Sequence, residues 1–221
     1  MIVKHGIRAA TVFALLGLTS MRAAAQRTTA PLTAGDLPTQ LGPATRQAIT
    51  RLGDSLRASR LPDEPLYAKA AEGVLKGADD TRILSAVRTL ARELGEARAS
   101  LGNDADTAEL VAAASALHVG ATPAMLKGLR DTHAATASAG GGTSLATPLV
   151  ALADLLTRRV PAQVAAAAID SLVARGAPTD DFAALRAAVE RDIDAGRAPE
   201  ASVLARTQGL LRNIDGKRRA P

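Results

Sequence analysis

The chain of 221 residues contains no cysteine and no tryptophan, and its aromatic residues are limited to one tyrosine and two phenylalanines. The lack of cysteine excludes disulfides, iron–sulfur clusters, thiolate zinc sites and cysteine nucleophiles. The shortage of aromatic rings removes the platforms on which nucleic-acid bases stack and the cages that hold quaternary ammonium groups. Hydrophobic residues nevertheless make up 47% of the chain. The core must therefore consist of alanine and branched aliphatic side chains that pack closely.

Histidine is also scarce, with only His5, His118 and His133. There is no HExxH sequence and no pair of histidines four residues apart, so a zinc site would need carboxylates from distant helices. No GxSxG sequence marks a serine nucleophile. The triple glycine at 140–142 lacks the GK[ST] sequence that follows in phosphate-binding loops. The sequence therefore predicts no catalytic set, no cofactor and no metal.

The N-terminus has the pattern of a secretory signal peptide over residues 1–25. Two basic residues precede an apolar run at 9–21 that is too short to span a bilayer, and three alanines at 23–25 follow after Arg22, which departs slightly from the pattern. We expect cleavage between Ala25 and Gln26 and an exported protein, either periplasmic or secreted. An uncleaved anchor or a buried first helix is the alternative.

The charge of the chain depends on this cleavage. The formal net charge is +5, but residues 1–25 hold three basic residues and no acidic one, which leaves 24 basic against 22 acidic residues and a net charge of +2. A near balance of charge, together with export and few aromatics, argues against a nucleic-acid partner. No later apolar run is long enough to cross a bilayer, so we expect no transmembrane segment in the mature chain.

Helical signals extend over almost all of the remaining chain, and no alternating pattern indicates a strand. The clearest helix is predicted at 80–101, where apolar residues from Ile83 to Leu101 recur every three or four positions and so share one face. Asp79 is expected to cap its start and Gly102 to end it. Further helices are predicted at 43–59, 65–76 and 106–117, and others start near Thr122, Thr147, Pro161, Thr179 and Pro199.

These signals predict an all-α fold of eight or nine helices, arranged as a multi-helix bundle or as stacked helical hairpins, after an N-terminal signal peptide. The sequence pattern does not separate one bundle from two helical halves. The expected divisions are a flexible lead at 26–41, a helical half at 42–133, a joint rich in Gly, Ala, Ser and Thr at 134–147, a second helical half at 145–215 and a basic tail at 216–221.

The most distinctive polar cluster lies on the second predicted helix, where Lys69, Glu72 and Lys76 share one face. Glu72 and Lys76 stand in the favourable order for an ion pair four residues apart, so a surface ion-pair ladder is the simplest interpretation. Asp63 and Glu64 precede this helix between two prolines. We take these five residues as the candidate surface for a protein partner.

The same region resembles a known group of proteins. Residues 61–101 begin LPDEPLYAKAAEGVLKG, and this segment is similar to an LPxEPLxxKxxEGxxKG pattern in uncharacterised exported bacterial helical proteins with no assigned activity. The resemblance implies export and a helical fold, and it implies no chemistry.

Three functional hypotheses follow. The first is a non-enzymatic exported protein that binds another envelope protein through a helical surface. The second is a binder of an apolar or lipidic ligand between helices, which requires an enclosed cavity lined by leucine and alanine. The third is an unrecognised hydrolase or metal-dependent enzyme, which requires convergent acids and histidines, such as His118 or His133 facing acids of another helix.

Overall fold

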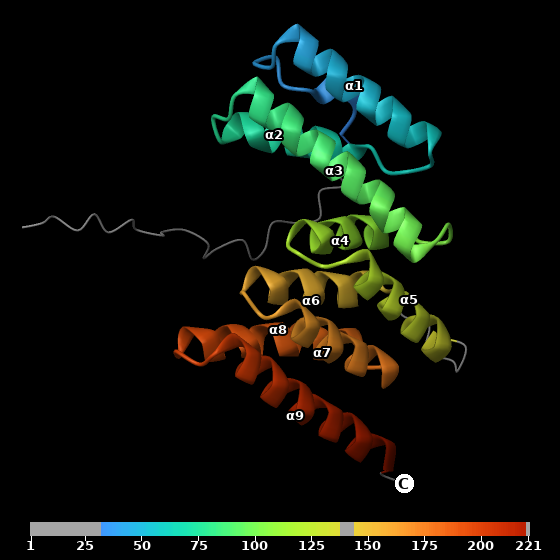
Figure 1. Ribbon diagram of the computed structural model, residues 1–221, viewed down its shortest axis with the longest axis vertical. Coiled ribbons are helices and arrows are strands. Elements are labelled where there is room, and N and C mark those ends of the chain that lie inside the picture. Colours follow the sequence, from blue (N-terminus) through green and yellow to red (C-terminus); the bar gives the residue numbers. More distant parts are fainter. Residues whose placement is uncertain (1–31, 138–143, 220–221) are drawn as a thin grey trace, which may run out of the picture. The chain divides into compact units, whose positions relative to one another are not determined.

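The computed structural model describes residues 32–137 and 144–219. Within these ranges the chain forms nine α-helices, one short 3₁₀ helix and no strand (Figure 1). The prediction of an all-α fold with eight or nine helices is confirmed for this part of the chain. The predicted signal peptide at 1–25 lies outside the described residues.

The helices agree closely with the sequence pattern. The four helices predicted with both ends, at 43–59, 65–76, 80–101 and 106–117, each match within one residue at either end. The elements are η1 (Ala34–Asp36), α1 (Pro43–Ala58), α2 (Glu64–Leu75), α3 (Asp80–Leu101), α4 (Thr107–His118), α5 (Pro123–Ala137), α6 (Ala146–Thr157), α7 (Ala162–Ala174), α8 (Thr179–Asp194) and α9 (Pro199–Arg219).

Local capping explains where several helices begin. The Asp79 carboxylate accepts a hydrogen bond from the Arg82 backbone N–H at 2.9 Å and so caps α3. At the start of α4, Asp106 and Glu109 each accept from the other's backbone N–H, which forms a capping box. Gly102 ends α3 with a φ of 92°, a conformation that glycine adopts without strain.

The start of α6 lies one residue before Thr147, near which the helix was predicted to start. The helix begins at Ala146, and Leu145 occupies the capping position. The Glu109 carboxylate of α4 accepts a hydrogen bond from the Leu145 backbone N–H at 2.9 Å, and Ser144 Oγ accepts from the Ala146 N–H at 3.2 Å. A cap supplied partly by another helix is not visible in the local sequence.

The helices pack in two rows. In one row α4 contacts α6 and α6 contacts α8, and in the other α3 contacts α5, α5 contacts α7 and α7 contacts α9 (Figure 1). Contacts of α2 with α3, α6 with α7 and α8 with α9 hold sequential helices together, and α1 packs on α2 and α3. This neighbour pattern fits a multi-helix bundle in which most helices pack on both a sequential and a more distant neighbour.

The helices on either side of the predicted joint at 134–147 contact each other directly, because α4 packs against α6 and α5 against α7. Residues 138–143 of this joint lie outside the described residues. All described helices belong to one compact unit that begins at Leu32. Two helices run further than predicted: α5 continues to Ala137, and α9 continues through the start of the predicted basic tail to Arg219.

The segment predicted as a flexible lead, residues 26–41, differs in its described part. Thr33 donates hydrogen bonds from its backbone N–H and its hydroxyl to the Asp36 carboxylate, both at 2.8 Å, and η1 forms there. Leu37 and Leu41 are buried in the core, and η1 packs on α1. Burial of these two leucines therefore holds residues 32–41 against the core, although the Thr, Pro and Gly content of the segment is typical of a loop.

Alanine allows α4 to lie between two other helices. Four of its alanines are buried, and the helix contacts both α3 and α6. Because methyl side chains occupy little space, the neighbouring helices can approach closely on both sides. This central position brings the C-terminal half of α4 next to α2 and α3, where the candidate site lies.

Candidate functional site

A groove of about 270 Å³ lies where α2, α3 and α4 meet, and we call it the α2–α4 groove. Ten residues line it, and six of them are apolar. The groove opens to solvent beside His118, whose side chain is 60% exposed. The apolar lining consists of Pro65, Ala86, Leu90, Val111, Ala114 and Val119.

Helical spacing explains why these side chains share one groove. On α4, Val111, Ala114, Ser115 and His118 stand three, four and seven residues apart, which places them on a single face. On α3, the groove residues flank the apolar face that forms the core. The end of α4 therefore presents its last turn, with the imidazole, towards α3.

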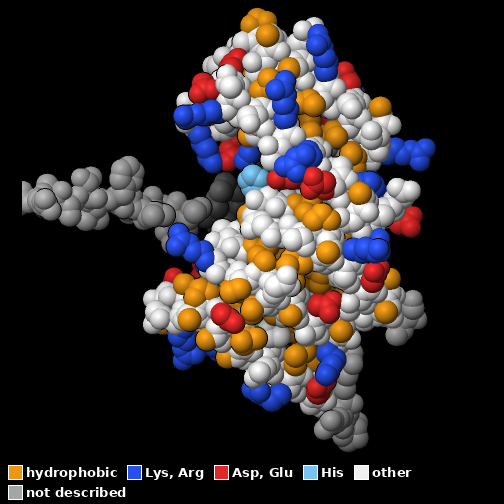
Figure 2. Space-filling view, viewed as in Figure 1, with side chains coloured by type: hydrophobic (Ala, Val, Ile, Leu, Met, Phe, Trp, Pro, Cys, Tyr) orange, Lys and Arg blue, Asp and Glu red, His pale blue; other side chains and the backbone are white. Residues whose placement is uncertain are grey.

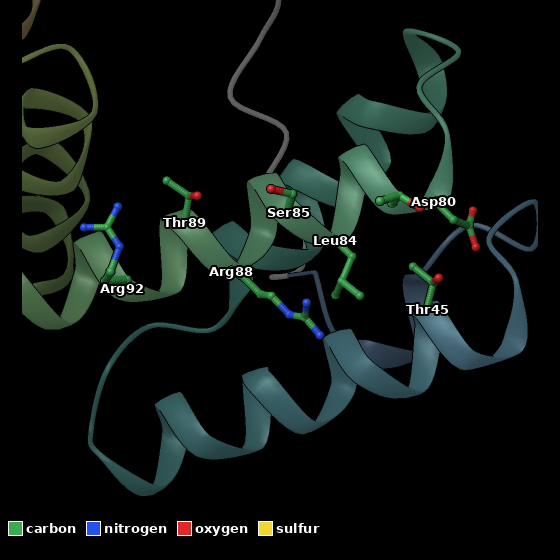
Figure 3. A pocket seen from close by; sticks show the side chains of 8 residues that line it. Thr45, Asp80, Leu84, Ser85, Arg88, Thr89 and Arg92 are labelled. Atoms are coloured by element: carbon green, nitrogen blue, oxygen red, sulfur yellow. The ribbon is translucent and has the colours of Figure 1, made fainter.

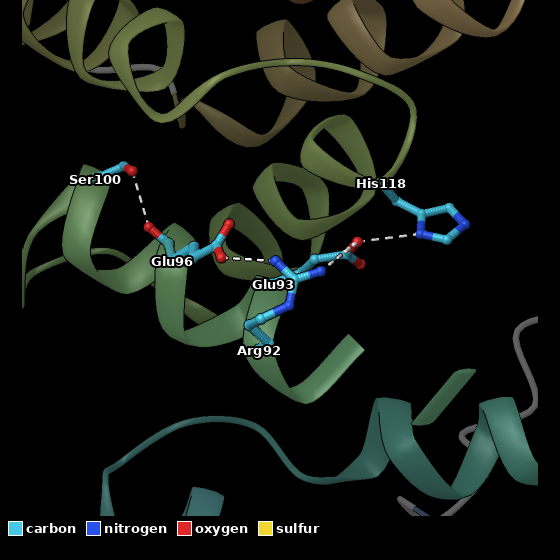
Figure 4. A network of polar contacts seen from close by, with 5 residues as sticks. All are labelled: Arg92, Glu93, Glu96, Ser100 and His118. Atoms are coloured by element: carbon cyan, nitrogen blue, oxygen red, sulfur yellow. Dashed lines mark hydrogen bonds and ion pairs between the residues drawn. The ribbon is translucent and has the colours of Figure 1, made fainter. Parts of the chain in front are cut away.

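The polar group at the centre of the groove wall is the Glu93 carboxylate. Glu93 is 5% exposed, although glutamate is rarely buried unless it is paired. Glu93 Oε1 lies 3.2 Å from His118 Nδ1, within hydrogen-bonding distance (Figure 4). Among the described residues, the Glu93 side chain makes no other hydrogen bond. Its partner therefore lies at the exposed mouth of the groove.

The other cations near Glu93 have closer carboxylate partners. Arg92 Nη2 is 4.0 Å from Glu93 Oε1, whereas Arg92 Nη1 is 2.7 Å from Glu96 Oε1 (Figure 4). Lys69, which lines the groove from α2, has its Nζ 3.0 Å from Glu72 Oε2. His118 is therefore the nearest polar partner of the buried carboxylate.

The ladder predicted on α2 is present as ion pairs. Glu72 pairs with Lys69 and, through its other oxygen, with Lys76. Hydrogen bonds from Lys76 and Lys69 lower the pKa of the Glu72 carboxyl. We refer to these three residues as the α2 ladder. Lys69 belongs both to the ladder and to the lining of the α2–α4 groove.

The two acidic residues of the predicted surface lie at the start of α2, outside the α2 ladder. Asp63 accepts a hydrogen bond from the Tyr67 hydroxyl at 3.0 Å and pairs with Arg57 Nε of α1 at 2.9 Å. Burial, together with the Asp63 carboxylate, raises the pKa of the Tyr67 hydroxyl. Asp63 therefore fastens the start of α2 to α1. Glu64 is exposed in the first turn of α2.

A wider depression of about 580 Å³ lies between α1 and α3, but its side chains do not converge (Figure 3). Leu84 and Arg88 point from α3 towards α1, whereas Ser85, Thr89 and Arg92 point to another side. On the face drawn in Figure 2, side chains of both charges are interspersed with hydrophobic ones. The α2–α4 groove is therefore the more defined candidate site.

The groove contains a serine, a histidine and a glutamate, but they do not form a catalytic relay. The Ser115 hydroxyl donates to the Val111 backbone oxygen at 2.9 Å, and among the described residues it makes no hydrogen bond with His118. A nucleophile needs its base within hydrogen-bonding reach. His133 lies on α5, away from the groove lining.

Comparison with known proteins finds no family model that matches the chain, and no curated protein or solved structure with a significant match. Within residues 32–137 and 144–219, no group of three or more His, Asp or Glu side chains is placed to hold a metal ion. In the same part of the chain, no helix is both long and apolar enough to cross a membrane.

Sequence reasoning identified Lys69 and His118 but missed Glu93. Glu93 stands directly before Leu94 of the apolar face and three residues after Leu90. The sequence signal for Glu93 is an acidic residue at the edge of an apolar helix face. Such a position becomes buried when another helix packs against that edge.

Proposed function

We propose that this protein is a non-enzymatic exported protein that binds another envelope protein, and that the α2–α4 groove is the centre of the binding surface. The observation that carries this proposal is an open apolar groove bordered by charged side chains of the α2 ladder and by His118. Protein interfaces have this composition, with an apolar centre surrounded by a polar rim.

The size of the groove favours a protein partner over a small ligand. Sites for small molecules enclose roughly 300–1,000 Å³ and bury most of the ligand. The groove offers about 270 Å³ and opens to solvent. It therefore suits one or two side chains of a partner, which is how anchor residues occupy pockets at protein interfaces. An apolar or lipidic ligand would leave much of its surface in water.

The groove alone is too small for a stable interface, which covers roughly 800 Å² on each partner. The adjacent face of α2 extends the surface, because Lys69 joins the groove to the rest of the α2 ladder. Surface ion pairs of this kind contribute little to stability, typically about 0–1 kcal/mol. The ladder is therefore available to exchange its partners when another protein docks.

A site-specific crosslink tests the proposal. The mature protein, starting at Gln26, would carry a photo-crosslinking residue in place of Val119 in the groove lining and be irradiated in the native envelope fraction. Ser115→Trp would block the groove mouth, since Ser115 is exposed and its hydroxyl bonds only within α4. We expect one stoichiometric protein adduct that Ser115→Trp abolishes.

Thr157→Trp is the matched control. Thr157 is also exposed, and its hydroxyl donates to the backbone oxygen four residues earlier at 2.9 Å, but it lies on α6. This variant should keep the adduct. An adduct that survives Ser115→Trp, or the absence of any protein adduct, would contradict the proposal. A lipid that co-purifies and is displaced by Ser115→Trp would support the lipidic-ligand hypothesis instead.

Export is part of the same proposal and has its own test. The signal-like pattern at 1–25 and the resemblance at 61–101 support it. Intact-mass analysis of the protein isolated from the envelope should give a chain that begins at Gln26. A chain that retains residues 1–25 in the cytosolic fraction would contradict export and leave the groove to be tested separately.

A further inference from the structure

The occupant of the groove can be specified further from the environment of Glu93. We propose that the α2–α4 groove receives a lysine or arginine side chain of the partner, with its aliphatic stem on the apolar lining and its cationic head against the Glu93 carboxylate. This inference rests on the proposed function and names the chemistry of the anchor residue.

The first argument is the burial of Glu93 in an apolar surrounding. A buried carboxylate is strongly disfavoured unless donors compensate its charge. Glu93 is 5% exposed and has one hydrogen-bonding partner among the described residues, the exposed His118 at 3.2 Å. A carboxylate accepts hydrogen bonds at several lone-pair positions. Glu93 therefore retains capacity for a further donor.

The second argument is that the neighbouring lysine and arginine each lie closest to a carboxylate other than Glu93. Lys69 pairs with Glu72 at 3.0 Å, and Arg92 pairs with Glu96 at 2.7 Å but stands 4.0 Å from Glu93. Each cation that borders the groove thus has a closer carboxylate than Glu93. Arg92 reaches Glu93 only at 4.0 Å, so a cation inside the groove would lie closer to the Glu93 carboxylate than Arg92 does.

The third argument is the combination of surfaces that the occupant meets. Lysine and arginine bury their methylene stems along apolar surface while the charged head reaches a polar partner. The groove offers apolar residues such as Leu90 and Val111 together with Glu93. A purely apolar side chain would exclude water from Glu93 without replacing the lost hydrogen bonds, and an acidic side chain would be repelled.

The experiment compares two blocked tripeptides, one with arginine between two leucines and one with citrulline in its place, which has nearly the same shape and no charge. Binding to the mature protein is followed by amide NMR shifts of Leu90 and Val119. We expect the arginine peptide to bind at the groove at least about tenfold more tightly than the citrulline peptide. Glu93→Gln should abolish this preference.

Glu64→Gln is the matched control, because it removes the same charge from an exposed position next to groove residue Pro65. It should preserve the arginine preference. His118→Ala provides a second variant if Glu93→Gln fails to fold. Removing the imidazole leaves Glu93 without its partner, so the arginine preference should increase, whereas a purely structural role of the pair predicts no change in preference.

The outcomes separate this inference from the proposed function. Equal binding of both peptides at the groove, or an arginine preference that persists in Glu93→Gln, overturns the cationic anchor while the crosslink to a protein partner can still hold. The absence of groove shifts with either peptide at millimolar concentration also overturns it. Loss of the groove-dependent crosslink, in contrast, overturns the proposed function itself.

Discussion

The hydroxyl of Tyr67 occupies the space beside Gly53 in the middle of α1, and this contact gives a sharp test of the packing. An alanine Cβ at position 53 would lie 2.1 Å from Tyr67 Oη and 2.9 Å from its Cζ. Tyr67 is 1% exposed and donates its hydroxyl proton to Asp63. The ring therefore has little freedom to move aside.

Opposing terms set the size of the effect of Gly53→Ala. Overpacking of a filled core typically costs about 1–3 kcal/mol, and breaking the hydrogen bond to Asp63 costs about 1 kcal/mol more. Helix propensity acts in the opposite direction, because alanine is favoured over glycine in a helix by about 0.5–1 kcal/mol. We expect a net decrease of about 1–3 kcal/mol in the free energy of unfolding.

Urea unfolding followed by circular dichroism measures this change, with Gly95→Ala as the control. Gly95 also lies inside a helix, but a Cβ there would meet nothing within 4 Å. Gly95→Ala should therefore stabilise the protein slightly, by about 0.5–1 kcal/mol. In a Tyr67→Phe background the penalty of Gly53→Ala should shrink, because the nearest atom is removed. Equal stabilisation by both glycine substitutions would refute the packing argument.

Three further predictions concern polar contacts outside the groove. Hydrogen bonds from Arg206 at 2.6 and 2.8 Å lower the pKa of Asp192 below its ordinary value of 3.8. This ion pair therefore stabilises the folded state at pH values above 3.8, and the stabilisation is lost as the pH falls below the lowered pKa of Asp192. Asp192→Asn should lower the thermal midpoint at neutral pH and make the midpoint less dependent on acid pH. An unchanged dependence of the midpoint on acid pH would contradict this. Asp106→Ala removes the cap of α4 and should cost about 1 kcal/mol in urea unfolding. Glu109→Ala removes the hydrogen bonds that Glu109 accepts from the Asp106 and Leu145 backbone N–H groups, and it should lower the free energy of unfolding by about 1–2 kcal/mol. A smaller loss than for Asp106→Ala would argue against the link between α4 and α6.

The helices were predictable because their signals are local. Periodic apolar residues and the Asp79 cap define α3, and the reciprocal pair of Asp106 and Glu109 defines the start of α4. The order in the segment before α1 was not predictable, since only burial of Leu37 and Leu41 against other elements distinguishes it from a loop. Local spacing carries no information on such distant contacts.

The candidate site was predictable only in part for the same reason. Lys69 stands out in the sequence because its ladder partners lie on the same helix. Glu93 and His118 are 25 residues apart and meet only because α4 packs on α3. The helix dipole alone is enough to explain a histidine at the C-terminus of α4. The contact of His118 with Glu93 depends on how α3 and α4 pack, which no short sequence motif indicates.

The alanine content connects the fold to the groove. A helix with small residues can approach its neighbours closely, but wherever the facing residues are also small, space remains between the backbones. Ala114 of α4 is fully buried, and it lines the groove together with Ala86 of α3. The methyl groups of Ala114 and Ala86 fill less of the groove than leucine side chains would at the same positions. The same choice of residue that lets α4 pack between two helices therefore leaves an unfilled position beside Glu93, which is where the proposed anchor side chain would lie.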